Sequence, residues 1–160
     1  MRLRALLTAH FNFVWRGLRR LGLSPADADD GAQKVFVIAS RKLSSIASGS
    51  ERQFLFRAAL RVASKRRRGP KHAGEESRSE RLTELEQARL DLNDILAAMK
   101  LEPRAVFVLY ELEEMTVPEI ASLLDLGSDT VTSRLRVARE EFDLSLRRLR
   151  VRGQSPGANE

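Results

Sequence analysis

Residues 116–142 read TVPEIASLLDLGSDTVTSRLRVAREEF, a stretch with explicit start and stop signals for two helices. Thr116 and Glu119 are spaced as a capping box, in which each side chain accepts a hydrogen bond from the other residue's backbone N–H. Apolar residues follow at positions 120, 121, 123 and 124, and Asp125-Leu126-Gly127 interrupts the helical pattern. The stretch therefore predicts a short helix, a tight turn and a longer helix that runs through Arg150.

The longer helix divides into a packing seam and an outward row. Advancing by about 100° per residue from Val131 places three further apolar residues within roughly 40° of it. These seam residues are Leu135, Ala138 and Phe142. The residues that point away are Asp129, Ser133, Arg136 and Glu140, with Thr130 and Thr132 at the sides. The free face of this helix therefore carries short hydrogen-bonding groups and an arginine.

This arrangement is typical of a helix-turn-helix motif, whose second helix lies in the major groove of DNA. Arg136 and the short polar side chains of the outward row lie where base edges would be read. Arg134 and Arg139 lie nearer the edges of the seam, where phosphate contacts are expected. The alternative is a helical hairpin within a bundle, whose outer face contacts only solvent.

The rest of the chain has the same helical period, and no stretch shows sustained period-2 alternation, so we expect an all-α protein. Ser24 caps a second helix that runs to about Leu43, and a Ser-rich loop at 44–50 separates it from a third helix. Further helices are predicted over 82–99 and from Pro103 to Leu112. The first helix ends at Gly22 and carries an apolar face of Leu3, Leu6, Leu7, Phe11, Val14, Trp15, Leu18 and Leu21.

Charge divides the chain into two unlike parts. Residues 1–72 carry 16 basic and 4 acidic side chains, whereas residues 73–160 carry 12 basic and 18 acidic ones. Gly69–Glu80 lies at this boundary, is polar and lacks large apolar residues, which predicts an interdomain linker. The excess of positive charge in the first part suits a polyanionic partner, because each neutralised phosphate releases counterions.

Composition excludes several classes of protein. With no Cys, the chain has neither disulfides nor thiolate metal ligands. Its longest apolar run, Val35–Ala39, is far shorter than the roughly 20 residues that cross a bilayer, so we expect a cytoplasmic protein without membrane insertion. His10 and His72 lack companions at ligand spacing. We therefore expect no catalytic residue, no metal site and no cofactor, and we predict that the protein is not an enzyme.

A second cluster lies at 54–57, where Phe54-Leu55-Phe56-Arg57 joins aromatic and basic side chains beside the Ser-rich loop. Aromatic stacking combined with cationic contacts to the backbone is how proteins hold unstacked single strands of nucleic acid. For Phe54 and Phe56 the alternative is that each ring packs in the hydrophobic core.

Three linked segments resemble the bacterial RNA polymerase sigma factors of the sigma-70 family, extracytoplasmic-function (ECF) group. They are LGLSPADADDGAQKVF at 21–36, FLFRAA at 54–59 and the stretch from Thr116 to Arg139, in the order found in that family. The resemblance implies two small helical domains, a sigma-2-like three-helix domain at 1–68 and a sigma-4-like helix-turn-helix domain at 81–152. A flexible linker at 69–80 would join them, and 153–160 would form a disordered tail.

The resemblance also implies a role for each cluster of residues. Core polymerase would dock on the second helix at Asp30, Gln33 and Phe36. The −10 promoter element would contact Ser44, Ser45, Arg52, Phe54, Phe56, Arg57 and Arg61 as an unpaired strand. The −35 element would be read by Ser128, Asp129, Thr130, Thr132, Ser133, Arg134, Arg136 and Arg139. The implied partners are promoter DNA, core RNA polymerase and an anti-sigma factor that masks both domains.

Several positions depart from the usual pattern of that family. Gly31 and Lys34 stand in the docking helix where a large apolar residue and an acid are usual. Ser40 and Phe54 stand in place of tryptophan, and Arg61 stands in place of asparagine. The departures indicate a divergent member.

Two other functions are compatible with the same residues. A conventional helix-turn-helix regulator would bind two half-sites about one turn apart as a symmetric dimer, without core polymerase. The third alternative is a helical protein that sequesters a sigma factor. The basic first half disfavours it, because a mimic of nucleic acid is acidic.

Overall fold

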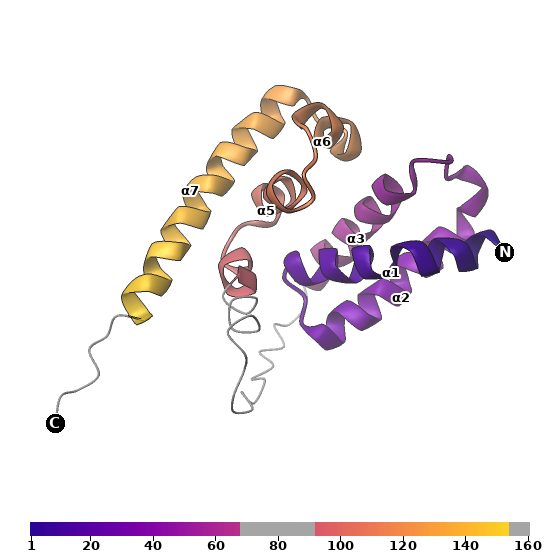
Figure 1. Cartoon of the computed structure of the whole chain (residues 1–160), viewed down its shortest axis with the longest axis horizontal. Coiled ribbons are helices and arrows are strands. Elements are labelled where there is room, and N and C mark those ends of the chain that lie inside the picture. The colour runs from indigo at the N-terminus through magenta and orange to yellow at the C-terminus, as the bar shows by residue number, and fades with distance from the viewer. Residues whose placement is uncertain (68–91, 154–160) are drawn as a thin grey trace.

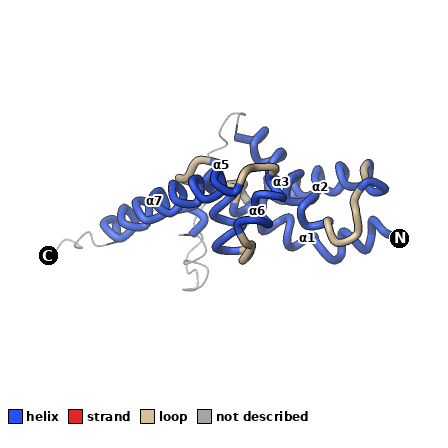
Figure 2. The backbone as a smooth tube through the Cα atoms, turned by 90° about the horizontal axis from the view of Figure 1, so that it is seen from above, coloured by secondary structure: helices blue, strands red, loops and turns tan. Residues whose placement is uncertain are grey.

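The computed structural model describes residues 1–67 and 92–153, and this part of the chain is helical and contains no β-strand. The helices form two groups, one from the N-terminal part and one from the C-terminal part (Figure 1). Figure 2 shows short loops between the helices of each group. The predicted all-α class with two small helical domains is therefore confirmed. No helix in the described ranges is both long and apolar enough to span a membrane.

The N-terminal domain packs three helices around one apolar core. The helices are α1 (Arg2–Arg20), α2 (Pro25–Arg41) and α3 (Glu51–Arg67). The predicted start of α2 is confirmed, because the Ser24 hydroxyl accepts a hydrogen bond from the Asp27 backbone N–H at 3.2 Å. Leu18, Val35 and Leu55, one from each helix, are completely buried.

Two details of this domain differ from the sequence-based expectation. The segment 44–50 is not loop throughout, because Leu43–Ser45 forms a turn of 3-10 helix, η1, directly after α2. Leu7 and Phe11 were expected on the packed face of the first helix but are 42% and 37% exposed. Helical spacing predicts the face on which a residue lies. How much of that face is buried depends on how the neighbouring helices pack against it.

Three side chains surround Gly31 closely and leave little room for a larger residue. A Cβ at this position would lie 3.1 Å from Leu18, 3.3 Å from Leu23 and 3.3 Å from Val62. The large apolar residue that is usual in the family would not fit between these neighbours without moving them. The close approach of Leu18, Leu23 and Val62 to Gly31 is therefore consistent with glycine at this position.

The C-terminal domain contains a helical segment at 92–97 and four further elements. They are α5 (Leu101–Phe107), the π-helix η2 (Val108–Leu112), α6 (Val117–Leu124) and α7 (Ser128–Gly153). The predicted linker at 69–80 and the first part of the predicted helix 82–99 lie outside the described residues. The domain boundaries therefore stay a prediction.

The helix predicted from Pro103 to Leu112 is wrong in two respects. It begins earlier, at Leu101, and from Val108 onward it widens into the π-helix η2, in which the Glu113 N–H donates to the Val108 carbonyl at 3.0 Å. Gly153, predicted as the first residue of the tail, is the last residue of α7, and 154–160 lie outside the described residues.

The capping box at the start of α6 is confirmed. The Thr116 hydroxyl accepts from the Glu119 N–H at 3.3 Å, and the Glu119 carboxylate accepts from the Thr116 N–H at 3.3 Å. Asp125 ends the helix with a left-handed backbone, φ 55°. The turn between α6 and α7 is thus set by local sequence, which explains why it was predictable.

Candidate nucleic-acid interface

The two faces of α7 are arranged as the helical angles predicted. Val131, Leu135 and Ala138 are buried, and Phe142 stacks on Phe107 with ring centroids 4.8 Å apart. Arg134 is half-buried, and the other residues predicted to contact the −35 element are exposed. These exposed residues are Ser128, Asp129, Thr130, Thr132, Ser133, Arg136 and Arg139. The outward row is therefore exposed on a helix that is anchored from behind.

Two side chains of this face already have partners. The Thr132 hydroxyl donates to the Ser128 carbonyl at 3.0 Å, so it is left with acceptor capacity toward any further ligand. Arg139 donates to Glu111 through Nε at 3.0 Å and Nη2 at 2.9 Å, and its guanidinium lies 5.2 Å from the centroid of the Tyr110 ring. The hydrogen bond to Glu111 raises the pKa of Arg139. Arg139 therefore ties α7 to η2, which the sequence did not indicate.

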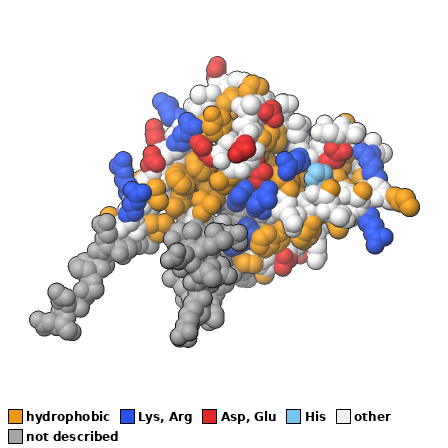
Figure 3. All heavy atoms as spheres, in the orientation of Figure 1, with side chains coloured by type: hydrophobic (Ala, Val, Ile, Leu, Met, Phe, Trp, Pro, Cys, Tyr) orange, Lys and Arg blue, Asp and Glu red, His pale blue; other side chains and the backbone are white. Residues whose placement is uncertain are grey.

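The N-terminal domain brings most of the residues predicted for the −10 element to its surface. Ser44, Ser45, Arg52, Arg57 and Arg61 are exposed, and Phe54 is half-buried. Lys and Arg side chains are visible along α7 and where the two domains meet (Figure 3).

Phe56 is a correction to the predicted site. Its side chain is 2% exposed and its ring lies 6.4 Å from that of Phe13, against Gly17 of α1. A buried ring cannot stack on a base, so Phe56 belongs to the core, which was the alternative for this residue. Phe56 is buried because it lies on the side of α3 that faces α1.

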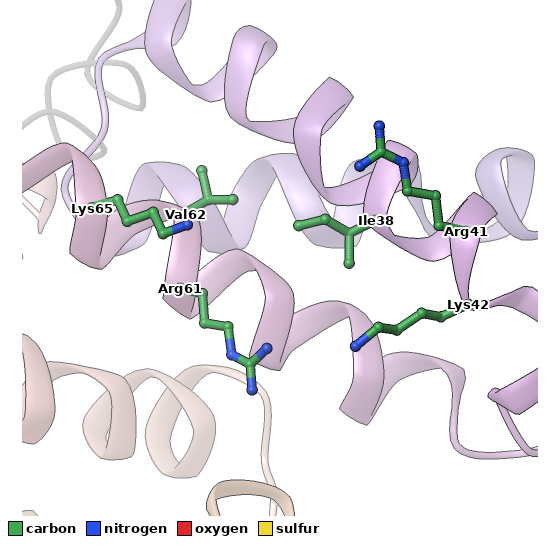
Figure 4. A pocket seen from close by; sticks show the side chains of 6 residues that line it. All are labelled: Ile38, Arg41, Lys42, Arg61, Val62 and Lys65. Carbon is green, nitrogen blue, oxygen red and sulfur yellow. The ribbon is translucent and has the colours of Figure 1, made fainter.

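A basic groove lies between α2 and α3, with a cavity volume of about 290 Å³. We call it the cationic groove, and it is lined by Ile38, Arg41, Lys42, Arg61, Val62 and Lys65. Figure 4 shows the four charged side chains around the two apolar ones. Four cations without a carboxylate in the lining make the groove suited to an anionic ligand such as a phosphate backbone.

Sequence reasoning found only Arg61 of these four cations. Arg61 and Lys65 are spaced four residues apart and thus lie on one face of α3, which is a signal that the sequence contains. Arg41 and Lys42 lie at the end of α2, and only the packing of α2 on α3 brings them to the same groove.

The three residues predicted to dock on core polymerase differ in their surroundings. Gln33 is exposed, whereas Phe36 is 5% exposed and stacked on Phe11, with ring centroids 6.2 Å apart. Asp30 accepts from Arg66 of α3 and pairs with Lys34 at 3.3 Å. The hydrogen bond and charge of Lys34, together with Arg66, lower the pKa of Asp30.

Sequence reasoning missed an exposed apolar side chain beside this cluster. Val37, four residues after Gln33 on α2, is 48% exposed. Phe11 and Leu7 of α1 are further exposed apolar side chains of this domain. No group of three or more potential metal ligands lies together within residues 1–67 and 92–153.

Comparisons with known proteins agree with this geometry. Residues 89–142 match the family model for sigma-70, region 4. No curated protein sequence matches the chain. The solved structure of CnrH in complex with the cytosolic domain of CnrY has 26% sequence identity and a TM-score of 0.69, and the match covers 90% of this chain and 86% of that one.

A second solved structure shares the fold. The sigma factor RpoE in complex with the anti-sigma factor NepR, from Bartonella quintana, is 16% identical, with a TM-score of 0.70 over 90% of this chain and 96% of that one. Both matches cover nine-tenths of this chain and hence both of its domains. The chain thus matches sigma-70, region 4, at 89–142, and its two-domain fold is similar to the folds of CnrH and of the sigma factor RpoE.

Proposed function

We propose that this chain is a transcription initiation factor that binds core RNA polymerase and directs it to promoters by recognising −10 and −35 elements. The observation that carries the proposal is the exposed polar row of α7, which lies within the residues that match region 4. The family consists of initiation factors rather than enzymes, so its members act by binding and positioning.

The −35 element would be read by the first turns of α7. Arg136 projects from the outward row, and arginine can donate two parallel hydrogen bonds to O6 and N7 of a guanine. Ser133 lies beside it as a short donor and acceptor. Thr132 would act as an acceptor only, because its proton is donated to Ser128.

The −10 element would bind the N-terminal domain as an unpaired strand. The cationic groove would hold its phosphates, and a base would stack on Phe54, which is half-buried and thus the more accessible ring of the aromatic pair. Ser44 and Ser45, exposed in the turn after α2, would contact the base edges. Phe56 has no part in this surface.

Core polymerase would dock on the exposed side of α2. Gln33 offers a hydrogen-bonding group and Val37 an apolar side chain. Asp30 adds a carboxylate that is stabilised in its charged form by Lys34 and Arg66. An anti-sigma factor is a further proposed partner, because the matched structures are complexes with the cytosolic domain of CnrY and with the anti-sigma factor NepR.

Run-off transcription tests the function. Core RNA polymerase would be combined with the purified chain and a pool of templates randomised at the −10 and −35 positions. We expect transcripts only when the chain is present, and enrichment of two unlike sequence elements at fixed spacing. A matched reaction with the substitution Arg136→Ala should alter the upstream element alone.

The rival function predicts a different result from the same chain. A conventional dimeric regulator would shift to a dimer on a duplex with two inverted half-sites, as measured by sedimentation, and would leave core polymerase inactive. Dimer formation on such a duplex without stimulation of core polymerase would overturn the proposal.

A further inference from the structure

The outer side of α7 carries three exposed apolar residues that lie seven residues apart. They are Val137, Leu144 and Val151, which are 37%, 50% and 71% exposed. Seven residues are close to two turns of an α-helix, so the three side chains lie within about 40° of one another on one face. We call these three residues the outer stripe. Figure 1 shows α7 along one edge of the molecule, on the side away from the N-terminal domain.

Charged residues flank the outer stripe in an order that reverses at Leu144. Glu140 and Glu141 come four and three residues before Leu144, and Arg147 and Arg148 come three and four residues after it. Residues three or four apart are neighbours on a helix surface, so all four charges lie beside Leu144. The face therefore reads apolar, acidic, apolar, basic, apolar, and its two halves are alike in apolar residues and opposite in charge.

These charges are accessible to a partner. Glu140, Arg147 and Arg148 are exposed and form no ion pair with any residue that the structure describes. Glu141 is half-buried and accepts a hydrogen bond from the Lys100 backbone N–H at 3.3 Å. Glu140 and the two arginines therefore keep their capacity to pair, whereas part of the capacity of Glu141 is already used.

Two copies of α7 complement each other when they run antiparallel. Glu140 and Arg147 lie on one side of the outer stripe, because residues seven apart share a side. Glu141 and Arg148 lie on the other side. A twofold axis at Leu144 keeps the sides and exchanges the helix ends, so Glu140 of one copy meets Arg147 of the second. In a parallel pair, acids would face acids and arginines would face arginines, which repel each other.

We propose that two copies of this chain associate through the outer stripes of α7, antiparallel and centred on Leu144. Val137 of each copy packs against Val151 of the second. The charge order identifies the second copy as the occupant, because this one helix contains both halves of the complementary pattern. Three apolar side chains per copy form a small interface, so the association is transient and depends on protein concentration.

The association and DNA binding by α7 exclude each other. The major groove is about 12 Å wide and a helix with its side chains is about 10–12 Å across, so the groove holds one helix. Arg136 and Arg139, which are exposed on either side of Val137 in the sequence, are proposed DNA contacts. A second helix against Val137 would occupy the space of the duplex. This exclusion rests on the proposed function, whereas the association itself does not.

Sedimentation velocity of the full chain tests the association. We expect the average mass to rise from monomer toward dimer between about 5 μM and about 500 μM, as for a small transient interface. Leu144→Glu places two carboxylates against each other at the twofold axis and should raise the dissociation constant at least about tenfold. The matched control is Leu7→Glu, the same change at a residue of α1 that is 42% exposed, which should leave the dissociation constant unchanged.

A charge exchange tests which residues meet. Glu140→Arg alone and Arg147→Glu alone each turn two attractions per dimer into repulsions, and each should raise the dissociation constant at least about fivefold. The two substitutions combined should restore it. Circular dichroism of each variant checks that the helices are intact. Two weakened single variants without recovery in the double variant would overturn the proposed pairing.

Cross-linking with a bis-maleimide tests the orientation, because the chain contains no other Cys. Leu144→Cys should couple to itself. A mixture of Val137→Cys and Val151→Cys should give more product than either variant alone. Self-coupling of Val137→Cys above that of the mixture would indicate a parallel pair and overturn the proposal. Coupling of Leu144→Cys to a subunit of core polymerase, and never to a second copy, would assign the outer stripe to polymerase instead.

A DNA titration separates the association from the proposed function. A fluorescent duplex of about 20 base pairs and mixed sequence, which a basic helix binds through phosphates, would be added to Leu144→Cys before cross-linking. At saturation, judged by fluorescence anisotropy, we expect the cross-linked product to fall at least about fivefold. An undiminished product on saturated duplex would overturn the exclusion. A chain that stays monomeric at all concentrations would overturn the association, whereas a chain that dimerises without binding the duplex would count against the proposed function.

Discussion

Arg136 and Arg139 lie three residues apart on α7, yet their guanidinium groups have different surroundings. Arg136 is exposed on the outward row, whereas Arg139 is paired with Glu111 and lies against Tyr110. A side chain that is already oriented by protein contacts is suited to hold a phosphate. A side chain that projects freely into the groove is suited to read a base.

At the residue scale we therefore predict different effects for Arg136→Ala and Arg139→Ala. Arg136→Ala should relax the preference at one or two positions of the upstream element by about 1–3 kcal/mol. Arg139→Ala should lower transcription from all sequences by a similar factor and reduce the salt dependence of binding. Selection from a randomised −35 element measures both. A changed base preference in Arg139→Ala alone would contradict the placement of α7 on DNA.

Gly31 gives a second prediction at this scale, on stability. Gly31→Leu would force a side chain between Leu18 and Val62 and should lower the free energy of unfolding by about 1–3 kcal/mol. The control is Ala26→Leu, at an exposed position of the same helix, which should change it by no more than about 0.5 kcal/mol. Urea unfolding followed by circular dichroism measures both. Equal stability of the two variants would show that the helices can move apart around residue 31.

At the scale of elements, α2 and α3 are joined by a charged clamp as well as by the apolar core. Arg66 of α3 donates to Asp27 and Asp30, one turn apart on α2, and Lys34 also pairs with Asp30. The clamp lies at the end of the helices opposite the cationic groove residues Arg41 and Lys42. It therefore joins the first turns of α2 to the last turn of α3.

The clamp predicts a dependence of stability on pH. Because the pKa of Asp30 is lowered in the folded state, its contribution is complete above about pH 4 and is lost as the pH falls through the lowered pKa. Asp30→Asn should therefore reduce the stability difference between pH 5 and pH 2. Urea unfolding at a series of pH values measures this slope. The same slope in Asp30→Asn and in the unsubstituted chain would mean that Asp30 gains nothing from its partners.

At the scale of the whole molecule, the surface of α2 and the surface of α7 lie in different domains and should be separable. Gln33→Ala combined with Val37→Ala should weaken binding to core polymerase while leaving helical content unchanged, because both side chains are exposed. The matched control is Thr130→Ala combined with Ser133→Ala on α7, which should weaken promoter binding but not core binding. Pull-down of core polymerase measures the difference. Equal recovery of core by both double variants would favour the dimeric regulator.

Local sequence determined a large part of this protein. The capping box at Thr116, the cap at Ser24 and the seam of α7 were all predictable, because a cap or a helical face depends on residues within one or two turns of each other. The same holds for the all-α class and for the exposed row that is the proposed −35 surface. The change from α-helix to the π-helix η2 was not predicted by any local pattern in the sequence.

Tertiary packing decided what local spacing leaves open. Phe56 is in the core and Phe54 is not, because α1 covers one side of α3 and not the other. Arg41 and Lys42 join Arg61 and Lys65 in one groove only because α2 packs against α3. Arg57 and Arg104 bind carbonyls 65 and 83 residues away in sequence. Contacts of that range depend on how the two domains meet, and neither helical periodicity nor charge along the chain specifies that arrangement.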